Sequence, residues 1–168
     1  MPLILRPFGP ADEAPALAAA TEFNGTGFDF LTLDFDPRMP WEQWTALMER
    51  YQRGIDLPEH RVRGAFLAAD VDGQLVGRAS IRFELNEFLA TRGGHIGYGV
   101  IPAFRRRGYA TAILNESIKI ARSEGVGALL LTCDDDNVES ASVIERCGGV
   151  LESITLADDG TAFRRYWI

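Results

Sequence analysis

The stretch from His95 to Ile120 constrains the fold of this chain more than any other part of its sequence. It predicts a strand, a short irregular turn and a long amphipathic helix. Apolar or small residues recur from Ala110 to Ala121 at the spacing of one helical face, whereas the other face carries polar residues such as Lys119 and Arg122. The turn therefore stands between the end of a strand and the N-terminus of a helix.

The turn carries three consecutive arginines, Arg105, Arg106 and Arg107, at the helix end where the macrodipole is already positive and acidic residues are usually favoured. The stretch 88–115 contains four arginines and no Asp or Glu, although the chain has a formal net charge of -7. Gly108 lets a ligand approach the backbone N–H groups that a helix leaves free at its start. A solvated surface run is the alternative, but the strand before the turn and the helix after it favour a site for a phosphate-bearing ligand.

Residues 100–110, VIPAFRRRGYA, resemble the acyl-CoA pyrophosphate loop of the GNAT superfamily of N-acetyltransferases. The core pattern of that loop is Arg/Gln-x-x-Gly-x-Gly/Ala, and Arg105, Gly108 and Ala110 occupy its three defining positions. The resemblance covers most of the chain and is best from Phe66 onward. In that part, a bacterial subgroup of predicted acetyltransferases is similar in the segments 95–98, 137–149 and 165–168.

This resemblance implies an α/β (α+β) fold, in which helices flank a central, mixed, mostly antiparallel twisted sheet. It also implies an acetyl-CoA-dependent N-acetyltransferase that moves an acetyl group from the thioester to a primary amine by direct attack. The acceptor is expected to be a small-molecule or peptide amine. Acidic residues near the expected cleft would suit a cationic amine, and they are Asp29, Asp34, Asp36, Glu84 and Asp134.

Composition limits the alternatives to this interpretation. Of the 168 residues 46% are hydrophobic and 24% charged, so residues 1–168 are expected to form a single domain with its own core. The net negative charge argues against non-specific binding to nucleic acids. No stretch approaches the roughly 18 apolar residues of a membrane helix, and the N-terminus lacks a signal pattern, which predicts no membrane partner and a cytoplasmic location. Two cysteines and two histidines offer neither a disulfide framework nor a metal-ligand spacing.

The rest of the sequence predicts strands and helices in a definite order. A hairpin turns at Asp72-Gly73, and its second strand alternates apolar and polar residues, so that Arg82 and Glu84 share one polar face. Asp12 is the expected N-cap of the first helix. Residues 129–133 indicate a buried strand of the parallel kind. The expected strands are 3–5, 66–69, 75–85, 95–100, 129–133, 150–156 and 163–168, the helices are 12–20, 40–53, the central helix between Gly108 and Gly125, and 140–147, and the loops are 22–40, 54–64 and 86–94.

The resemblance implies roles for particular residues of the cofactor site. Backbone N–H groups from Arg106 to Thr111 are expected to hold the diphosphate, and Val100 and its neighbours to pair with the pantetheine arm, with the Val100 amide as the candidate that polarises the thioester carbonyl. Gly97 and Gly99 leave room on one face of their strand. Asn137 matches a family position that commonly hydrogen-bonds the cofactor arm. The predicted cofactor-binding residues are Val100, Ile101, Arg105, Arg106, Arg107, Gly108, Tyr109, Ala110, Thr111, Asn137 and Ser140.

The catalytic assignments leave alternatives open. His95 stands where many family members carry a Glu that acts through water, and its ordinary pKa suits proton transfer near neutral pH, although a structural hydrogen-bonding role is the alternative. Glu84 is the competing base. Many members have a Tyr as general acid seven residues after the Asn, but here that position is Ile144. Tyr98 or Ser142 is then the candidate acid, or the thiolate leaves unaided.

Two other functions compete with that of an N-acetyltransferase. The missing Tyr supports a catalytically silent acyl-CoA sensor of the same fold. A generic phosphate site in a nucleotide-binding domain is the third interpretation, but the chain has neither a Gly-x-x-x-x-Gly-Lys-Ser/Thr loop nor a Gly-x-Gly-x-x-Gly turn after its first strand. An exposed last strand also predicts an edge for a homodimer.

Overall fold

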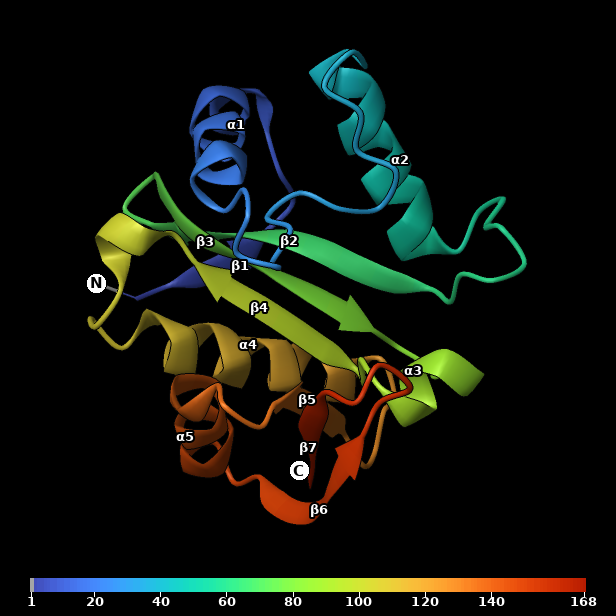
Figure 1. Ribbon diagram of the computed structural model, residues 1–168. Coiled ribbons are helices and arrows are strands. Elements are labelled where there is room, and N and C mark those ends of the chain that lie inside the picture. The colour runs from blue at the N-terminus through green and yellow to red at the C-terminus, as the bar shows by residue number, and fades with distance from the viewer. Residues whose placement is uncertain (1) are drawn as a thin grey trace.

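Seven strands form two sheets in the computed structural model, which describes residues 2–168 (Figure 1). The larger sheet has the order β1-β2-β3-β4 and the smaller one the order β5-β7-β6, and every neighbouring pair is antiparallel. The strands are β1 (Ile4–Arg6), β2 (Gly64–Val71), β3 (Gln74–Arg82), β4 (Ile96–Val100), β5 (Leu130–Asp134), β6 (Val150–Leu156) and β7 (Ala162–Trp167).

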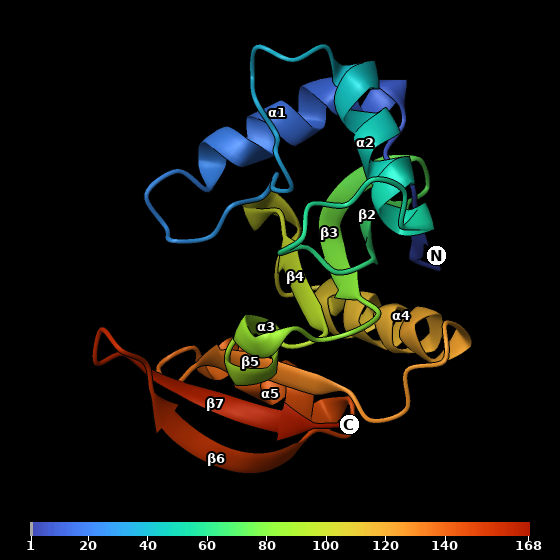
Figure 2. The same ribbon diagram turned by 90° about the vertical axis from the view of Figure 1, so that its right-hand side faces the viewer.

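Helices cover both faces of the larger sheet. α1 and α2 lie over one face, which we call the α1–α2 face, and α4 lies over the other, with α5 packed against α4 and β5 (Figures 1 and 2). No helix within residues 2–168 is long and apolar enough to cross a membrane. The helices are α1 (Glu13–Glu22), α2 (Trp41–Arg53), α3 (Glu87–Thr91), α4 (Tyr109–Ser123) and α5 (Val138–Arg146), with short 3₁₀ turns at Pro10–Asp12 and Pro102–Phe104.

Two cores lie on opposite faces of the larger sheet. The core under α1 and α2 is aromatic, because Trp44 is fully buried edge-on to Phe66, with ring centroids 5.8 Å apart, and Phe8 stacks on the same Phe66 at 5.7 Å. Such pairs contribute about 0.5–1.5 kcal/mol each beyond the area that they bury. The other core is aliphatic and includes Ile113 and Leu114 of α4. The aromatic residues of the core under α1 and α2 therefore hold these helices and the connection between them on the sheet.

β3 differs from its prediction in length and in burial. The strand ends at Arg82, so Glu84 lies beyond it and is exposed. Both faces of the strand are covered, and Arg78 and Ser80 are only 5% and 3% exposed. The predicted polar, solvated face is therefore wrong, because α1, α2 and the loop between them cover the face that alternation alone assigns to water.

Two hydrogen bonds, which we call the joint, connect the two sheets at the start of β4 and β5. The His95 N–H donates to the Leu130 carbonyl at 2.7 Å, and the Leu130 N–H donates to Nδ1 of the His95 ring at 2.9 Å. Beyond this joint no ladder links β4 to β5 within residues 2–168, and Figure 2 shows the smaller sheet running across the larger one. β5 pairs antiparallel with β7, so the prediction of a parallel strand is wrong. An apolar run indicates burial on both faces but not the direction of the neighbouring strand.

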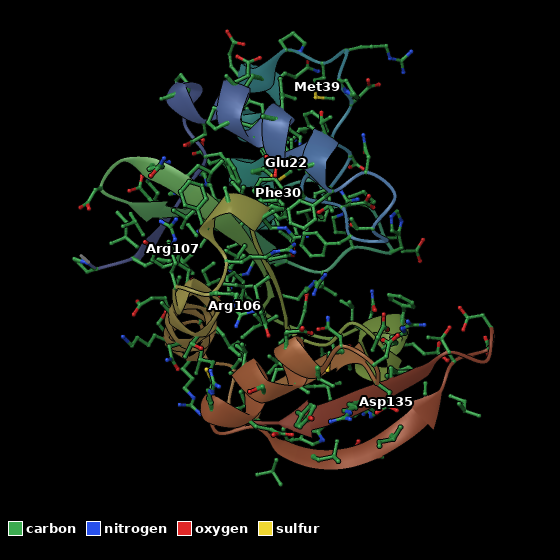
Figure 3. All side chains as sticks on the ribbon, turned by 60° about the vertical axis from the view of Figure 1, so that its left-hand side comes forward. Glu22, Phe30, Met39, Arg106, Arg107 and Asp135 are labelled. Atoms are coloured by element: carbon green, nitrogen blue, oxygen red, sulfur yellow. The ribbon has the colours of Figure 1, made fainter. Side chains whose placement is uncertain are left out.

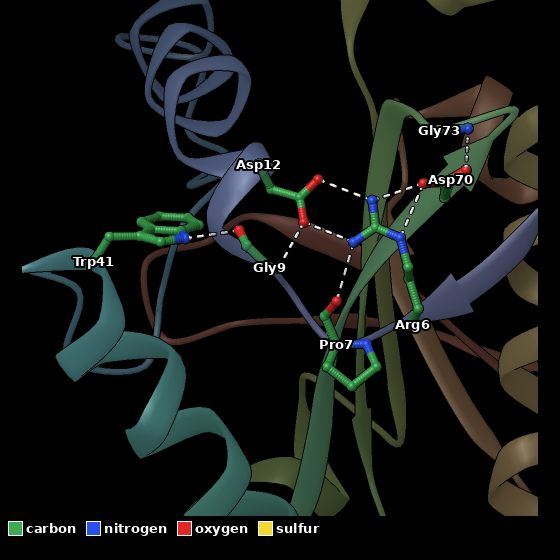
Figure 4. Close-up of polar contacts among 7 residues, drawn as sticks. All are labelled: Arg6, Pro7, Gly9, Asp12, Trp41, Asp70 and Gly73. Carbon is green, nitrogen blue, oxygen red and sulfur yellow. Dashed lines mark hydrogen bonds and ion pairs between the residues drawn. The ribbon is translucent and has the colours of Figure 1, made fainter.

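Two local predictions also need correction. The expected loop 86–94 contains α3, whose first turn is capped by the Asn86 side chain, which accepts from the Leu89 N–H at 2.9 Å. Asp12 precedes α1 but does not cap it with its side chain. Its carboxylate instead accepts from Arg6 at 2.6 and 2.9 Å and from the Gly9 N–H at 2.7 Å (Figure 4).

Arg6 joins three segments in Figure 4, because it also donates to Asp70 of β2 at 2.6 and 2.9 Å. Burial opposes ionisation of Asp12, but the bonds from Arg6 and Gly9 hold the pKa of this carboxyl below its ordinary value. Asp12 is thus used to attach β1 to the start of α1, which a capping rule applied to the sequence does not reveal.

The last strand, β7, lies in the middle of the smaller sheet between β5 and β6, so it offers no free edge. The two edge strands of this sheet are β5 and β6, and β6 exposes four large apolar side chains: Val150, Leu151, Ile154 and Leu156. A homodimer stays a prediction, and the edge available for it is β6 rather than the last strand. That residues 1–168 make one domain also stays a prediction.

Candidate active site

The turn before α4, residues 105–108, which we call the phosphate turn, presents a row of backbone donors. Arg106 and Gly108 both have left-handed backbones, with φ of 62° and 80°. Alternating conformations of this kind direct successive N–H groups toward one side, where they form an anion-binding concavity. The first helical bond of α4 runs from the Ala112 N–H to the Gly108 carbonyl at 3.1 Å, so the N–H groups of residues 109–111 have no backbone acceptor. A ligand can reach them, because nothing lies within 4 Å of the place where a Gly108 Cβ would stand.

The three arginines of the phosphate turn are exposed and directly precede α4. Figure 3 labels two of them, Arg106 and Arg107, at the start of this helix. Arg105 donates from Nε to the Val100 carbonyl at 3.2 Å and lies over the Phe23 ring at 5.5 Å. Arg107 donates to the Ala103 carbonyl at 3.3 Å. None of the three forms an ion pair with a residue in the described part of the chain. Their positive charge is therefore uncompensated, as a diphosphate site requires.

The edge of β4 that faces away from β3 leads into this turn. In an antiparallel ladder only alternate pairs exchange hydrogen bonds. Here the Arg82 N–H donates to the His95 carbonyl and the Ile101 N–H donates to the Val76 carbonyl. The N–H groups of residues 98 and 100 therefore point away from β3, toward the gap between the two sheets. Ile101, in contrast, is buried and uses its N–H within the ladder.

Residues of β4 and α5 meet across this gap. Tyr98 is within 3.0 Å of the Ser140 hydroxyl, and Asn137 caps α5 by accepting from the Ser140 N–H at 3.1 Å. Burial raises the pKa of Tyr98 to about 12, so its hydroxyl stays protonated at neutral pH. Ile144 is 1% exposed and belongs to the core, so this position of α5 supplies no proton donor.

The two candidate bases lie in different surroundings. His95 is 6% exposed, and its Nδ1 is the acceptor of the joint with Leu130. Burial lowers its pKa, and Nδ1 cannot take a proton while it accepts an N–H. Glu84 is exposed beyond the end of β3 and makes no ion pair with a residue that the structure describes.

Most acidic residues expected to attract a cationic amine are neutralised by arginines. Asp34 pairs with Arg61 at 2.5 Å, and Asp134 pairs with Arg92 at 3.0 Å. Asp36 is likewise held by its neighbour Arg38 at 2.7 Å. The negative charge left for an acceptor is therefore smaller than the sequence suggests.

The structure adds residues that the sequence analysis did not place in the site. Arg78 donates to the Phe30 carbonyl at 3.1 Å and to the Asp29 carbonyl at 2.6 Å, and it lies over the Phe28 ring at 4.3 Å. It thereby holds the α1–α2 connection over β4, where a Cβ on Gly99 would come within 2.4 Å of the Phe28 ring. Two signals in the sequence could have indicated these residues: an arginine inside an apolar strand, and the alternating glycines of β4.

The sequence model of the Acetyltransferase (GNAT) family matches residues 28–149. Because the match spans well over half of the chain, this protein belongs to the GNAT acetyltransferase family. The predicted fold and the predicted acyltransferase that uses acetyl-CoA are thereby confirmed. No curated protein sequence matches this chain significantly.

Several solved acetyltransferases have a similar fold. RimJ from Mycobacterium smegmatis, in complex with CoA-disulfide, has a TM-score of 0.72 at 18% identity, over 99% of this chain and 81% of RimJ. Ribosomal-protein-alanine N-acetyltransferase from Brucella melitensis has a TM-score of 0.69 at 20% identity, over 98% of both chains. The yncA protein from Salmonella typhimurium, solved with its cofactor acetyl-CoA, has a TM-score of 0.68 at 16% identity, over 100% of this chain and 94% of yncA. Identities this low establish a shared fold.

Proposed function

We propose that this protein transfers the acetyl group of acetyl-CoA to a primary amine, which attacks the thioester directly. The observation that carries the proposal is the phosphate turn, in which Arg106 and Gly108 are left-handed and the N–H groups that follow have no acceptor. A helix start of this kind binds phosphate groups. The free edge of β4 leads directly into it, so one extended cofactor can contact both.

The chain offers donors for each part of acetyl-CoA. The N–H groups of residues 106–111 would hold the diphosphate, and the uncompensated arginines attract it over a longer range. The N–H groups of Tyr98 and Val100 face the gap and would pair with the pantetheine arm in the manner of an added strand. The Val100 N–H is our candidate for polarising the thioester carbonyl. Arg105 connects this edge to the turn, because it donates to the Val100 carbonyl.

We assign the role of general acid to Tyr98. Its hydroxyl lies between β4 and α5, hydrogen-bonded to Ser140, and it keeps its proton because burial raises its pKa to about 12. A departing thiolate in the same gap would receive that proton, a transfer that typically contributes a factor of about 10² or more to the rate. Many family members have a Tyr as general acid at the position of Ile144. In this protein a residue of β4 would take that role.

We assign His95 a structural role in place of the predicted catalytic one. Its only unprotonated ring nitrogen in the neutral form accepts the Leu130 N–H, so protonation would break the joint between the two sheets. Glu84, the other predicted base, makes no ion pair with any residue from 2 to 168. Glu84 lies two residues beyond Arg82, which pairs with His95 at the end of β4 away from Val100. We therefore propose Glu84 as the base only through a relay of more than one water.

The acceptor is a small-molecule or peptide amine. The similar structure from Brucella melitensis is a ribosomal-protein-alanine N-acetyltransferase, which supports including N-terminal peptides among the acceptors to test. A cytoplasmic acceptor stays our prediction. One observation favours a second function, that of an acyl-CoA sensor: Ile144 is buried where the family commonly carries its general acid.

An amine panel with acetyl-CoA separates these functions. Release of the CoA thiol would be followed with polyamines, amino acids, aminoglycosides and short peptides, and thermal shifts would compare acetyl-CoA with ATP and NAD. We expect acetyl-CoA to stabilise the protein most and at least one amine to accelerate thiol release with formation of an N-acetyl product. Binding of acetyl-CoA without any amine-dependent release would favour the sensor, and stronger stabilisation by ATP or NAD would reject both.

A further inference from the structure

Two arginines of β3 lie on the α1–α2 face without a carboxylate partner. Arg78 is 5% exposed and Arg82 is half-buried, and neither forms an ion pair with any residue from 2 to 168. Arg78 uses Nε and Nη2 on two carbonyls of the α1–α2 connection. Its Nη1 makes no hydrogen bond within the described part of the chain, and the same holds for the whole Arg82 guanidinium.

This arrangement is unfavourable in the free protein. Removing a charged group from water costs several kcal/mol unless a counter-charge accompanies it, and the two cations also repel each other. Burial lowers the pKa of Arg78 to about 9 and the neighbouring Arg82 adds to that effect, while burial lowers the pKa of Arg82 as well. Contacts with the Phe28 and Phe66 rings offset part of the cost for Arg78 alone.

The free nitrogens converge on one point of β4. The position that a Cβ on Gly97 would occupy lies 3.6 Å from Nη1 of Arg82 and 3.8 Å from Nη1 of Arg78. Ser80 lies between the two arginines in β3 and is paired in register with Gly97. The carboxylate of Asp29, in the α1–α2 connection, is exposed and forms no ion pair with Arg78, although its charge opposes part of the lowering of the Arg78 pKa. An oxygen atom placed above Gly97 would therefore meet the Nη1 atoms of two guanidinium groups.

We propose that this cluster, Arg78, Ser80 and Arg82 above Gly97, binds a carboxylate of the acceptor, so that the substrate is an amine that also carries a carboxylate close to its nitrogen. A guanidinium matches the planar pair of carboxylate oxygens. The inference rests on the proposed function and adds the substrate class. It replaces the expectation of a purely cationic amine, which the neutralised acidic residues already weaken.

The position of the cluster limits the length of the substrate. Gly97 is adjacent to Tyr98 and three residues from Val100, whose N–H groups face the cofactor gap. With a rise of about 3.3 Å per residue, the carboxylate lies within roughly 10 Å of the reacting carbonyl. The substrate therefore carries its carboxylate no more than roughly 10 Å from the reacting nitrogen, a limit that a free amino acid and an N-terminal residue with an acidic side chain both meet.

Product analogues test the inference without knowledge of the true acceptor. Calorimetry on CoA-saturated protein would compare N-acetylglycine, with a main-chain carboxylate, N-acetylaspartic acid α-amide, with a side-chain carboxylate, and neutral N-acetylglycinamide. We expect at least one acid to bind about tenfold or more tightly than the neutral amide, which corresponds to about 1.4 kcal/mol. Which of the two acids binds more tightly identifies the source of the carboxylate. Equal binding of the acids and the amide would overturn the inference. It would also be overturned if neither acid bound at a concentration 20-fold higher than the one at which the amide binds.

Variants connect that preference to the cluster. Arg82→Gln should abolish the preference for acids, and it should leave the fold intact because the Arg82 side chain makes no hydrogen bond within residues 2–168. Arg63→Gln is the control, because it removes the same charge from an arginine already paired with Glu124 at 2.5 Å. This variant should retain the preference for acids. Gly97→Ala is an independent test, since its Cβ makes only ordinary contacts but fills the space between the two Nη1 atoms. A preference that persists in both Arg82→Gln and Gly97→Ala would refute the inference. Titration of CoA in the same samples separates the two failures, because CoA binding without a preference for acids rejects only the carboxylate subsite.

Discussion

Two groups of arginines lie near β4, and they differ in how the protein accommodates their charge. Arg105, Arg106 and Arg107 are exposed at the start of α4, where water and salt screen them and their cost is small. Arg78 and Arg82 lie under the α1–α2 connection, where an unpaired charge is expensive. The exposed group is suited to attract a large polyanion, and the buried pair is suited to select one small anion of fixed geometry.

The largest expected effect concerns the exposed group. Gly108→Val puts a branched side chain at a φ of 80°, which costs about 1–2 kcal/mol and forces the phosphate turn to rearrange. We expect the affinity for CoA, measured by calorimetry, to fall about 100-fold. Gly125→Val is the matched control, because Gly125 has a φ of 89° and equally open surroundings at the other end of α4. Equal losses in both variants would mean that the phosphate turn does not hold CoA.

A second substitution acts on the buried region alone. In Gly99→Ala the new Cβ would stand 2.4 Å from the Phe28 ring, so the α1–α2 connection must shift. We expect the free energy of unfolding in urea to fall by about 2 kcal/mol, as overpacking usually costs, and the KM for the amine to rise while the affinity for CoA is kept. Gly97→Ala, whose Cβ meets nothing closer than 3.6 Å, should keep wild-type stability. A stable Gly99→Ala variant would show that Phe28 is free to move.

The gap between the two regions holds the proposed acid. Tyr98→Phe should lower kcat by about tenfold or more and leave the KM for acetyl-CoA unchanged, because only proton donation is lost. Since the pKa of Tyr98 is raised to about 12, the wild-type rate should not decline between pH 8 and 10 on account of this group. Tyr166→Phe, which removes another hydroxyl, bonded to Glu145 at 2.9 Å, is the control. An unaltered kcat in Tyr98→Phe would assign the proton to another donor.

The joint between the sheets predicts a pH dependence. Burial lowers the pKa of His95, so the unfolded chain binds its proton more readily than the native protein. The stability contributed by the neutral ring is present above the ordinary pKa of 6.5 and is lost as the pH falls through the lowered native value. Between pH 7 and 5.5 the wild type should lose about 1 kcal/mol of unfolding free energy more than His95→Gln loses.

The exposed residue His60 provides the comparison for this measurement. Chemical denaturation of His60→Gln should show the same acid-induced loss as the wild type. Identical pH slopes in the wild type and in His95→Gln would contradict the structural role of the joint.

The smallest effect tests the comparison of exposed and buried charge directly. Raising NaCl from 50 to 500 mM should weaken binding of CoA about fivefold, because the exposed arginines are screened at these Debye lengths. The preference for acids over neutral amides should change less than about twofold, because the buried pair is shielded from salt. Both quantities come from the calorimetry described above. If CoA binding and the preference for acids depended equally on salt, the carboxylate would be bound by an exposed cation and not by the Arg78–Arg82 pair.

The phosphate turn was predictable because its signals are local. Arg105, Gly108 and the helical period after them lie within one stretch of sequence, and the structure shows free donors there. The hairpin at Asp72-Gly73 follows from equally local turn chemistry. The ends of β3, the helix α3 and the role of Asp12 were not predicted, because each depends on a partner that is remote or only weakly signalled.

By itself, the sequence determined the order of most elements, the family and the place of the phosphate turn, since each depends on spacing along the chain and on backbone preferences of single residues. Only the tertiary structure decided which face of β3 is covered, because the covering α1–α2 connection is remote in sequence. Phe30, for example, precedes its partner Arg78 by 48 residues. The same packing buries Arg78 and gives His95 its partner at Leu130. Charge and hydrogen-bonding capacity are properties of a residue, but their cost depends on what excludes water from them.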